Sequence, residues 1–309
     1  MVHYFRVVED KYQLIIIIFL SCKNVFLEMH PENQNQHRVS QVYLKQFGYH
    51  RDKRWWVSVY KVGNKKTENL LISSFTAEFN IFDAPYGDIE FRRNFEIQCG
   101  KIESFYPTII SNLTHQKKLT EKNIEVLCHF IASLLCRSIS FTDFIQKILR
   151  YEPARKRFVD EISMFKEENK LLLENIFNLV PVELQLNTIL GSITQHLVEV
   201  LRCFDFVVIE KSSEIAWGTT DNPVVIDKNG NHEWLLSPDS EIFLPLSRDF
   251  CLFAFHQEGV NKENPLRLLK SSTVNKVSFE EFEIIHEKII SNIFKYFVMP
   301  IEIEDTELS

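Results

Sequence analysis

The chain has 309 residues, of which 45% are hydrophobic and 25% charged, and its formal net charge is −7. These fractions are typical of a globular protein with an ordinary core. The acidic balance excludes a global positive field of the kind that draws a protein to nucleic acid, although it leaves room for a local basic patch. Six scattered cysteines without a Cys-x-x-Cys pair indicate neither a zinc site nor a disulfide framework, so we expect a cytoplasmic protein.

The first 28 residues differ from the rest of the chain. Residues 14–20 form an apolar run that is too short to span a bilayer. Glu9 and Asp10 precede the run, and no small-residue cleavage site follows it. We expect either that Met29 is the natural start or that residues 1–28 are a poorly packed extension. No transmembrane segment is predicted, and the sequence leaves the oligomeric state open.

A helix and a hairpin are predicted after a polar lead. In residues 37–47, apolar residues recur at helical spacing, and Gly48 follows as a stop signal. Residues of high strand propensity on both sides of a Gly-Asn turn predict a hairpin of residues 55–61 and 68–75. Further helices are then expected over residues 91–113, 123–149, 154–179 and 182–203.

The signal changes to strands in the last third of the chain. Strands are expected over residues 204–211, 214–218, 223–227, 241–246 and 250–255. Helix 278–297, with Ser278 as its N-cap, should follow them, before an acidic tail of residues 300–309. The pattern predicts an α+β fold, with a central helical bundle and an antiparallel sheet built mainly from the C-terminal half. We expect residues 29–299 to form a single domain.

Three charged residues lie inside the long apolar helices. Glu96 and Glu103 are seven residues apart, so both fall on nearly the same helical face, roughly 10 Å apart along the axis. At that distance they should not hold one ion together, and we expect Glu103 to serve the site and Glu96 to be a surface group. Arg137 needs a partner if it is buried, and Glu103 is the expected one. This pair is either structural or an anchor for a substrate phosphate.

His37 opens the first predicted helix, and Gln41 lies one turn further on. Imidazole titrates near neutral pH, so His37 is a candidate general base or metal ligand. Gln41 would orient a substrate beside it. The alternative is an ordinary histidine that faces solvent near the start of the helix.

A Thr-Asp-Asn-Pro turn follows the predicted strand 214–218. Asp221 and Asn222 are typical turn residues, so a purely structural turn is one interpretation. The functional interpretation places the Asp221 carboxylate and the Asn222 amide at a strand end. Together with the hydroxyl of Thr220, they would bind a metal, a phosphate ester or a substrate hydroxyl there.

The order and spacing of these motifs resemble the family called domain of unknown function 4238. Its members open with a signature that stands here at His37, Tyr43, Leu44 and Phe47. The other positions that match the family are Glu103, Arg137, 220–223, 243–246 and Asn275. The resemblance covers roughly residues 30–297 and implies positions without an assigned activity.

The sequence favours a hydrolase that acts on a phosphate ester, either a nuclease or an enzyme of nucleotides. It has no Gly-rich phosphate loop, G-x-S-x-G elbow or H-E-x-x-H helix, which disfavours motors, serine hydrolases and zincins. His37 would be the base, and Arg137 would bind the phosphate. Glu103 and Asp221 would be acidic or metal-holding groups, with a divalent cation as Lewis acid. The alternative is a non-enzymatic ligand-binding or sensing protein with a structural polar network.

Convergence of the polar motifs distinguishes the two hypotheses, because a shared active site is excluded if these side chains lie beyond one another's reach. A polar group buried alone costs roughly 1–3 kcal/mol, so several such groups are best tolerated where they satisfy one another. We therefore predict that the N-terminus of helix 37–47, Glu103, Arg137 and the turn 220–222 meet in one cleft. Arg137 should bond to Glu103 first and to Asp221 second.

Overall fold

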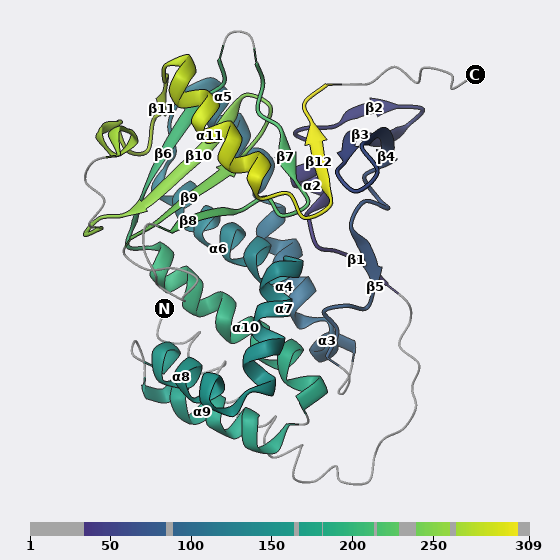
Figure 1. Cartoon of the computed structure of the whole chain (residues 1–309), viewed down its shortest axis with the longest axis vertical. Helices are drawn as coiled ribbons and strands as arrows, with labels where there is room; N and C mark the ends of the chain where they lie inside the picture. Colours follow the sequence, from purple (N-terminus) through teal and green to yellow (C-terminus); the bar gives the residue numbers. More distant parts are fainter. Residues whose placement is uncertain are drawn as a thin grey trace. The chain divides into compact units, whose positions relative to one another are not determined.

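Helices fill the middle of the chain and strands lie before and after them, so the predicted α+β class is confirmed (Figure 1). The computed structural model describes residues 34–84, 89–163, 167–180, 182–212, 215–228, 239–259 and 264–301. Residues 1–28, the start expected at Met29 and the tail beyond residue 301 lie outside these ranges. What the sequence predicts for them stays a prediction.

A short strand stands where the first helix was predicted to begin. β1 (Asn35–His37) pairs antiparallel with β5 (Ala77–Phe79), and α2 (Gln41–Leu44) follows Ser40. The predicted helix 37–47 is therefore wrong at its start, because the backbone of His37 is held extended by a distant strand. The apolar residues of the segment are nevertheless buried together.

The predicted hairpin is present and forms the centre of a sheet. Its strands are β3 (Arg54–Lys61) and β4 (Lys66–Leu71). The other edge of β3 pairs with β2 (Tyr49–Arg51) and with β12 (Tyr296–Met299) from the end of the chain. β12 also pairs with β7 (Thr219–Thr220). This sheet therefore joins segments from both halves of the sequence.

The other late strands form a second sheet in the order β11-β6-β10-β9-β8. Four of them are antiparallel: β6 (Phe204–Glu210), β8 (Val225–Lys228), β9 (Ser240–Pro245) and β10 (Phe250–His256). β11 (Val274–Asn275) runs parallel to β6 and follows a 3-10 turn, η1 (Pro265–Leu268). A strand over 214–218 was a wrong prediction for residues 215–218, which precede β7 without strand pairing.

Helix α11 (Phe279–Ser291) packs on this second sheet and supplies part of its core (Figure 1). The predicted N-cap is confirmed, since the Ser278 side chain accepts a hydrogen bond from the backbone of Glu281. The helix ends six residues before the predicted position. Its C-cap, Asn292, donates to the carbonyls of Asn222 and Val224 and directs the chain into β12.

The middle of the chain consists of helices that are shorter than predicted. They are α3 (Ile89–Arg92), α4 (Asn94–Glu103), α5 (Tyr106–Gln116), α6 (Glu121–Arg137), α7 (Ile139–Arg150), α8 (Glu152–Ser163), α9 (Glu167–Leu179) and α10 (Val182–Leu201). The predicted helix 123–149 is divided into α6 and α7, which meet at a 67° bend. No single helix in the described ranges has both the length and the apolar character of a membrane span, and α6 with α7 meets that test only as this bent pair.

An aromatic core ties the helices to the sheets beside the candidate site. The rings of Tyr106 and Phe130 stack with centroids 4.5 Å apart, and Tyr43 packs against both. Both tyrosine hydroxyls are buried and satisfied. The Tyr43 hydroxyl lies 2.5 Å from Oγ1 of Thr219, and the Tyr106 hydroxyl donates to the Leu246 carbonyl at 2.6 Å. These bonds fix α2 against β7 and α5 against the residue that follows β9.

Candidate functional site

Arg137 lies at the break between α6 and α7. It is the last residue of α6, and Ser138 has an extended backbone and caps α7 by accepting a hydrogen bond from the backbone of Phe141. The apolar run is therefore interrupted directly beside its internal charge. Arg137 is 1% exposed. A charge so strongly desolvated persists only with close partners of opposite charge.

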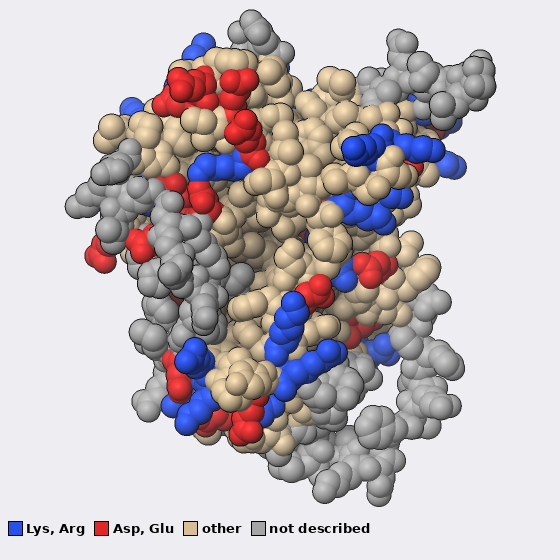
Figure 2. Space-filling model, viewed as in Figure 1, with Lys and Arg blue, Asp and Glu red and all other residues tan. Residues whose placement is uncertain are grey.

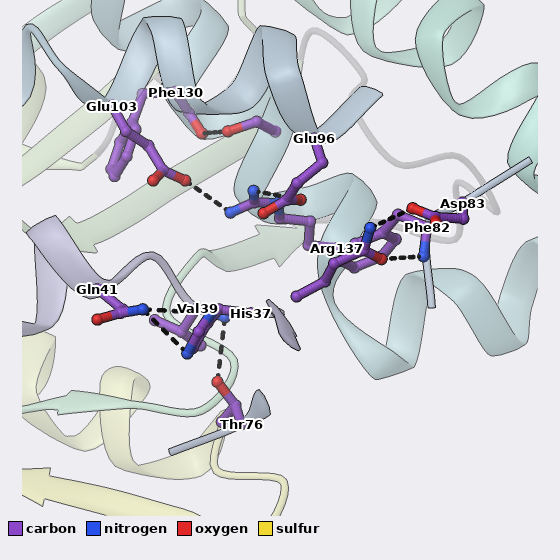
Figure 3. A network of polar contacts seen from close by, with 12 residues as sticks. His37, Val39, Gln41, Thr76, Phe82, Asp83, Glu96, Glu103, Phe130 and Arg137 are labelled. Atoms are coloured by element: carbon purple, nitrogen blue, oxygen red, sulfur yellow. Dashed lines mark hydrogen bonds and ion pairs between the residues drawn. The ribbon is translucent and has the colours of Figure 1, made fainter. Parts of the chain in front are cut away.

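Two carboxylates from α4 hold the Arg137 guanidinium (Figure 3). Nη1 donates to Glu103 Oε1 at 2.7 Å, and Nη2 donates to Glu96 Oε2 at 2.8 Å. The predicted bond from Arg137 to Glu103 is thus confirmed. The prediction of Glu96 as a surface group is wrong. The two Nη atoms of the guanidinium are far enough apart to bind both flexible glutamate side chains, whereas a single metal ion would not reach both. The side chains of Glu96 and Glu103 are 20% and 15% exposed, so the cluster is open to solvent on the carboxylate side only.

Burial and the mutual charges of this cluster shift its pKa values. Desolvation raises the pKa of Glu96, and Arg137 opposes that shift. Desolvation disfavours the charged form of Arg137, but Cys99 and both carboxylates raise its pKa above the usual value. The adjacent Cys99 has a pKa raised by burial to about 12, so its thiol is neutral at physiological pH. The cluster is therefore one permanent cation between two carboxyl groups.

A polar layer beneath Arg137 was not predicted from the sequence. The Phe82 ring lies 5.8 Å from the guanidinium, and the Phe82 backbone donates to the side-chain oxygen of Gln36 at 2.7 Å. The Gln36 amide also donates to the buried carboxylate of Asp83, which lies 3.6 Å from Arg93. The signal that singled out Arg137, a charge set among apolar residues, is also present at Asp83 in the run Ile-Phe-Asp-Ala.

His37 is buried at the end of β1 with its tautomer fixed. Its Nε2 lies 3.1 Å from the carbonyl oxygen of Ser73. A carbonyl can only accept, so Nε2 carries the proton and Nδ1 holds the lone pair. Desolvation lowers the pKa of His37 and outweighs the hydrogen bond to Ser73, which raises it; Arg137 lowers it and Glu103 raises it to smaller extents. The imidazole is therefore neutral near pH 7 and lies within electrostatic reach of the Arg137 cluster.

Gln41 and Arg38 complete the surroundings of His37, and Figure 3 shows the contact with Gln41. The Gln41 amide nitrogen lies 3.2 Å from Nε2 and 3.5 Å from Nδ1 of His37. Because Nε2 donates to Ser73, only Nδ1 can accept from Gln41. Arg38 Nη1 donates to the Arg137 carbonyl at 3.2 Å, which ties β1 to the end of α6. The structure thus brings His37, Gln41, Glu103 and Arg137 together.

The Asp221 turn does not join this cluster in the predicted way. The Asp221 carboxylate accepts hydrogen bonds from the backbone of Phe294 at 3.1 Å and of Lys295 at 2.9 Å. The second partner of Arg137 is Glu96, so the prediction of an Arg137–Asp221 bond is wrong. Asp221 instead stabilises the connection between α11 and β12, a role that a carboxylate can fill because it accepts two N–H groups at once.

Thr220 and Asn222 also make the contacts of a structural turn. Thr220 Oγ1 accepts from the backbone of Asn222 at 3.1 Å, and the Asn222 carbonyl accepts from the Asn292 side chain at 2.7 Å. Thr220 is buried at the pairing of β7 with β12. A role of these residues in substrate binding stays a prediction.

The acidic and imidazole groups do not fit a divalent cation. Among the described residues, no group of three or more His, Cys, Asp or Glu side chains is arranged to hold a metal ion. His37 and Glu103 share a cluster, but Glu103 is already bonded to Arg137.

The chain has a mixed α+β fold in which a buried arginine at a helix break binds two glutamates of another helix. The chain belongs to the family described as "Protein of unknown function (DUF4238)", whose sequence model matches residues 35–297. The resemblance noted from the motifs is thus confirmed. No curated protein and no solved structure matches the chain.

Proposed function

We propose that the chain is a hydrolase of phosphate esters in which His37 is the general base. The observation that carries this proposal is the buried, neutral imidazole beside the Arg137 cluster. Ser73 keeps the proton on Nε2, and the lowered pKa keeps Nδ1 unprotonated at neutral pH. A base in this state accepts a proton from a water molecule that attacks phosphorus.

Arg137 acts as a positioning residue in this proposal and not as the predicted phosphate ligand. Both of its Nη atoms are engaged by carboxylates, and a phosphate would have to displace one of them. Arg137 instead fixes Glu103, whose second oxygen is available to orient the attacking water. The amide of Gln41 would move from Nδ1 of His37 to a substrate oxygen, which leaves the Nδ1 lone pair to the attacking water.

Arg38 is the cation that we assign to the substrate phosphate. It follows His37 in the chain, and its Nε pairs with Glu78 at 2.5 Å. The Glu78 side chain is exposed while that of Arg38 is largely buried, and an ion pair with solvent access is worth about 0–1 kcal/mol. A phosphate can replace Glu78 at little cost, whereas Arg137 would lose buried partners. Nucleotides and nucleic acids remain the proposed substrate classes.

Turnover on a panel of phosphate esters tests the proposal. Purified protein is incubated with nucleotides, RNA, single-stranded DNA and a chromogenic phosphodiester, with EDTA, Mg²⁺ or Mn²⁺. His37→Gln should lower the rate by about 100-fold or more, as expected for loss of a general base. His115→Gln, which changes an exposed histidine of α5, should leave the rate unchanged. Folded wild-type protein without turnover on any substrate, or an active His37→Gln variant, would refute the assignment.

A ligand-binding or sensing protein is a second candidate, and the burial of Arg137 favours it. The Nη atoms of Arg137 serve internal partners, as in a structural network. In the described part of the chain, the buried Nε–H of Arg137 has no hydrogen-bond acceptor. An increase of the melting temperature with a nucleotide, without turnover and absent in Arg38→Gln, would support this candidate over the hydrolase.

A further inference from the structure

Strands β2, β3 and β4 carry a concentration of positive charge that the chain as a whole lacks. Residues 45–66 contain seven lysines and arginines and one aspartate, in a protein with a net charge of −7. We call these seven side chains the basic hairpin surface: Lys45, Arg51, Lys53, Arg54, Lys61, Lys65 and Lys66. Figure 2 shows basic side chains gathered over these strands, whereas acidic side chains gather over α11.

Aromatic rings alternate with these charges. Trp55 is 37% exposed, and the Nζ of Lys45 lies 5.9 Å from its ring centroid. His50 contacts the same ring with centroids 5.5 Å apart. On the opposite face of the hairpin, the guanidinium of Arg51 lies 5.1 Å from the ring centroid of Trp56. Both faces of this hairpin therefore offer an aromatic ring with a cation beside it.

The turns of the two hairpins hold lysines where a smaller residue would be favoured. Asp52 and Lys53 connect β2 to β3 with φ values of 51° and 61°, and Lys65 ends the turn before β4 with φ of 54°. Positive φ at the centre of a hairpin turn favours Gly or Asn over a residue with a long side chain. The side chains of Lys53 and Lys65 are exposed, so burial does not offset this cost. Their charge at the hairpin tips is what they contribute.

We infer that the basic hairpin surface binds single-stranded nucleic acid. Lysines and arginines attract the phosphates, and an exposed tryptophan stacks on an unpaired base, which is how sequence-tolerant single-strand binders work. A duplex offers the same phosphates but keeps its bases stacked out of reach of Trp55. A lipid surface would require apolar residues that enter it, but the hairpin tip that connects β2 to β3 carries charged side chains instead.

This inference rests on the proposed function, because it names single-stranded nucleic acid as the substrate class of the proposed hydrolase. Its test measures binding and not turnover. His37→Gln removes the proposed base, and it should bind an oligonucleotide as tightly as wild type. Binding without turnover would contradict the hydrolase alone. Turnover of small nucleotides without oligonucleotide binding would contradict the basic hairpin surface alone.

Fluorescence anisotropy with labelled DNA and RNA of about 12 nucleotides measures the affinity across a range of salt concentrations. The exposed lysines are removed together in Lys53→Gln/Lys65→Gln/Lys66→Gln. The slope of log affinity against log salt should then fall by about 2, since each phosphate contact on a single strand contributes roughly 0.7. Trp55→Leu should weaken binding by about tenfold, the lower range for loss of one stacked base.

A matched control lies elsewhere on the surface. Phe105 is 45% exposed, and the Nζ of Lys122 lies 5.4 Å from its ring centroid, so this pair has the same chemistry without the surrounding charges. Phe105→Leu/Lys122→Gln should bind like wild type. Equal loss in the control and in the lysine variant would overturn the inference. So would equal affinity for duplex and single strand, or binding to anionic vesicles without binding to the oligonucleotides.

Discussion

The Arg137 cluster and the Asp221 turn both remove carboxylates from water, but they satisfy them with different partners. At the cluster, two glutamates are bonded to one buried guanidinium. At the turn, one aspartate is bonded to two backbone N–H groups. Backbone donors carry no net charge and are fixed by the fold, whereas the guanidinium is a charge that itself needs carboxylates. The two regions should therefore respond differently when one member is removed.

The difference in partners also distinguishes a carboxylate with a structural role from one that still has an oxygen available for a substrate. Both oxygens of Asp221 accept backbone hydrogen bonds, which leaves little capacity for a substrate. Glu103 bonds Arg137 through one oxygen and lies near the neutral imidazole of His37. This comparison is the reason to place the proposed chemistry at the cluster and not at the turn.

The largest effect should follow from Arg137→Ala. The substitution leaves two partly buried carboxylates without their cation, and loss of one partner of a buried ion pair costs about 3–5 kcal/mol. Denaturation in urea should show this loss as a lower midpoint with an unchanged slope. Arg137→Lys should lose less stability, because it keeps the charge but cannot donate to both carboxylates in the same forked geometry.

The matched variant is Arg137→Met/Glu96→Gln/Glu103→Gln, which removes all three charges and keeps similar volumes. It should recover a large part of the stability that Arg137→Ala loses, since no buried charge is left unpaired. If Arg137→Ala unfolds at the same urea concentration as wild type, the guanidinium is not held as described and the comparison fails.

A smaller effect is expected from Asp221→Ala. It leaves the N–H groups of Phe294 and Lys295 without their acceptor, at a cost of about 1–2 kcal/mol, because Asp221 is only partly buried and water can replace it in part. Asp221→Asn should cost less, since the amide keeps one acceptor oxygen. Thermal unfolding measures both.

The rate of phosphate-ester hydrolysis provides a second test of the role of Asp221. Under the proposed function, Asp221→Asn hydrolyses the substrate at the wild-type rate. If the rate of hydrolysis falls by about 100-fold while the fold stays intact, Asp221 has a catalytic role. The hydrogen bonds of the turn would then not describe its function.

The sequence predicted elements whose pattern is local. The hairpin of β3 and β4, the strands β6, β9 and β10, and the cap at Ser278 all depend on residues close in the chain. The burial of Arg137 and its bond to Glu103 were predicted from the cost of an unpaired charge in an apolar helix. These predictions required no knowledge of the sheet partners.

The predictions that failed depend on distant pairing or on side-chain reach. β1 is extended because it pairs with β5, and β12 is a strand because β3 and β7 lie on either side of it. The sequence near residue 37 and near residue 296 contains no local pattern that predicts those partner strands. Glu96 was not predicted to belong to the site, because the distance between Glu96 and Glu103 along the helix is too long for both to bind one metal ion. The donor is instead a guanidinium with two separate Nη atoms.

The smallest effect is expected for Glu96→Gln. It is also the most direct test of whether burial or attraction to Arg137 dominates at the cluster. The folded pKa of Glu96 is raised, so its ionised form is disfavoured in the native state relative to the unfolded one. A raised pKa contributes stability that is fully present below the unfolded pKa, near 4.5, and is lost as the pH rises through the folded pKa. Glutamine resembles the protonated form at every pH and loses nothing over that range.

The stability of Glu96→Gln relative to wild type should therefore increase as the pH rises from below 4.5 toward neutrality. At pH 7 we expect a difference within about 1 kcal/mol, since the lost attraction to Arg137 is offset by the absence of a desolvated charge. Glu287→Gln, on the exposed face of α11, is the control and should show no such trend. Urea midpoints at several pH values measure it. If Glu96→Gln instead loses stability as the pH rises, attraction to Arg137 outweighs burial, and Glu96 is held as an ordinary carboxylate by its charge.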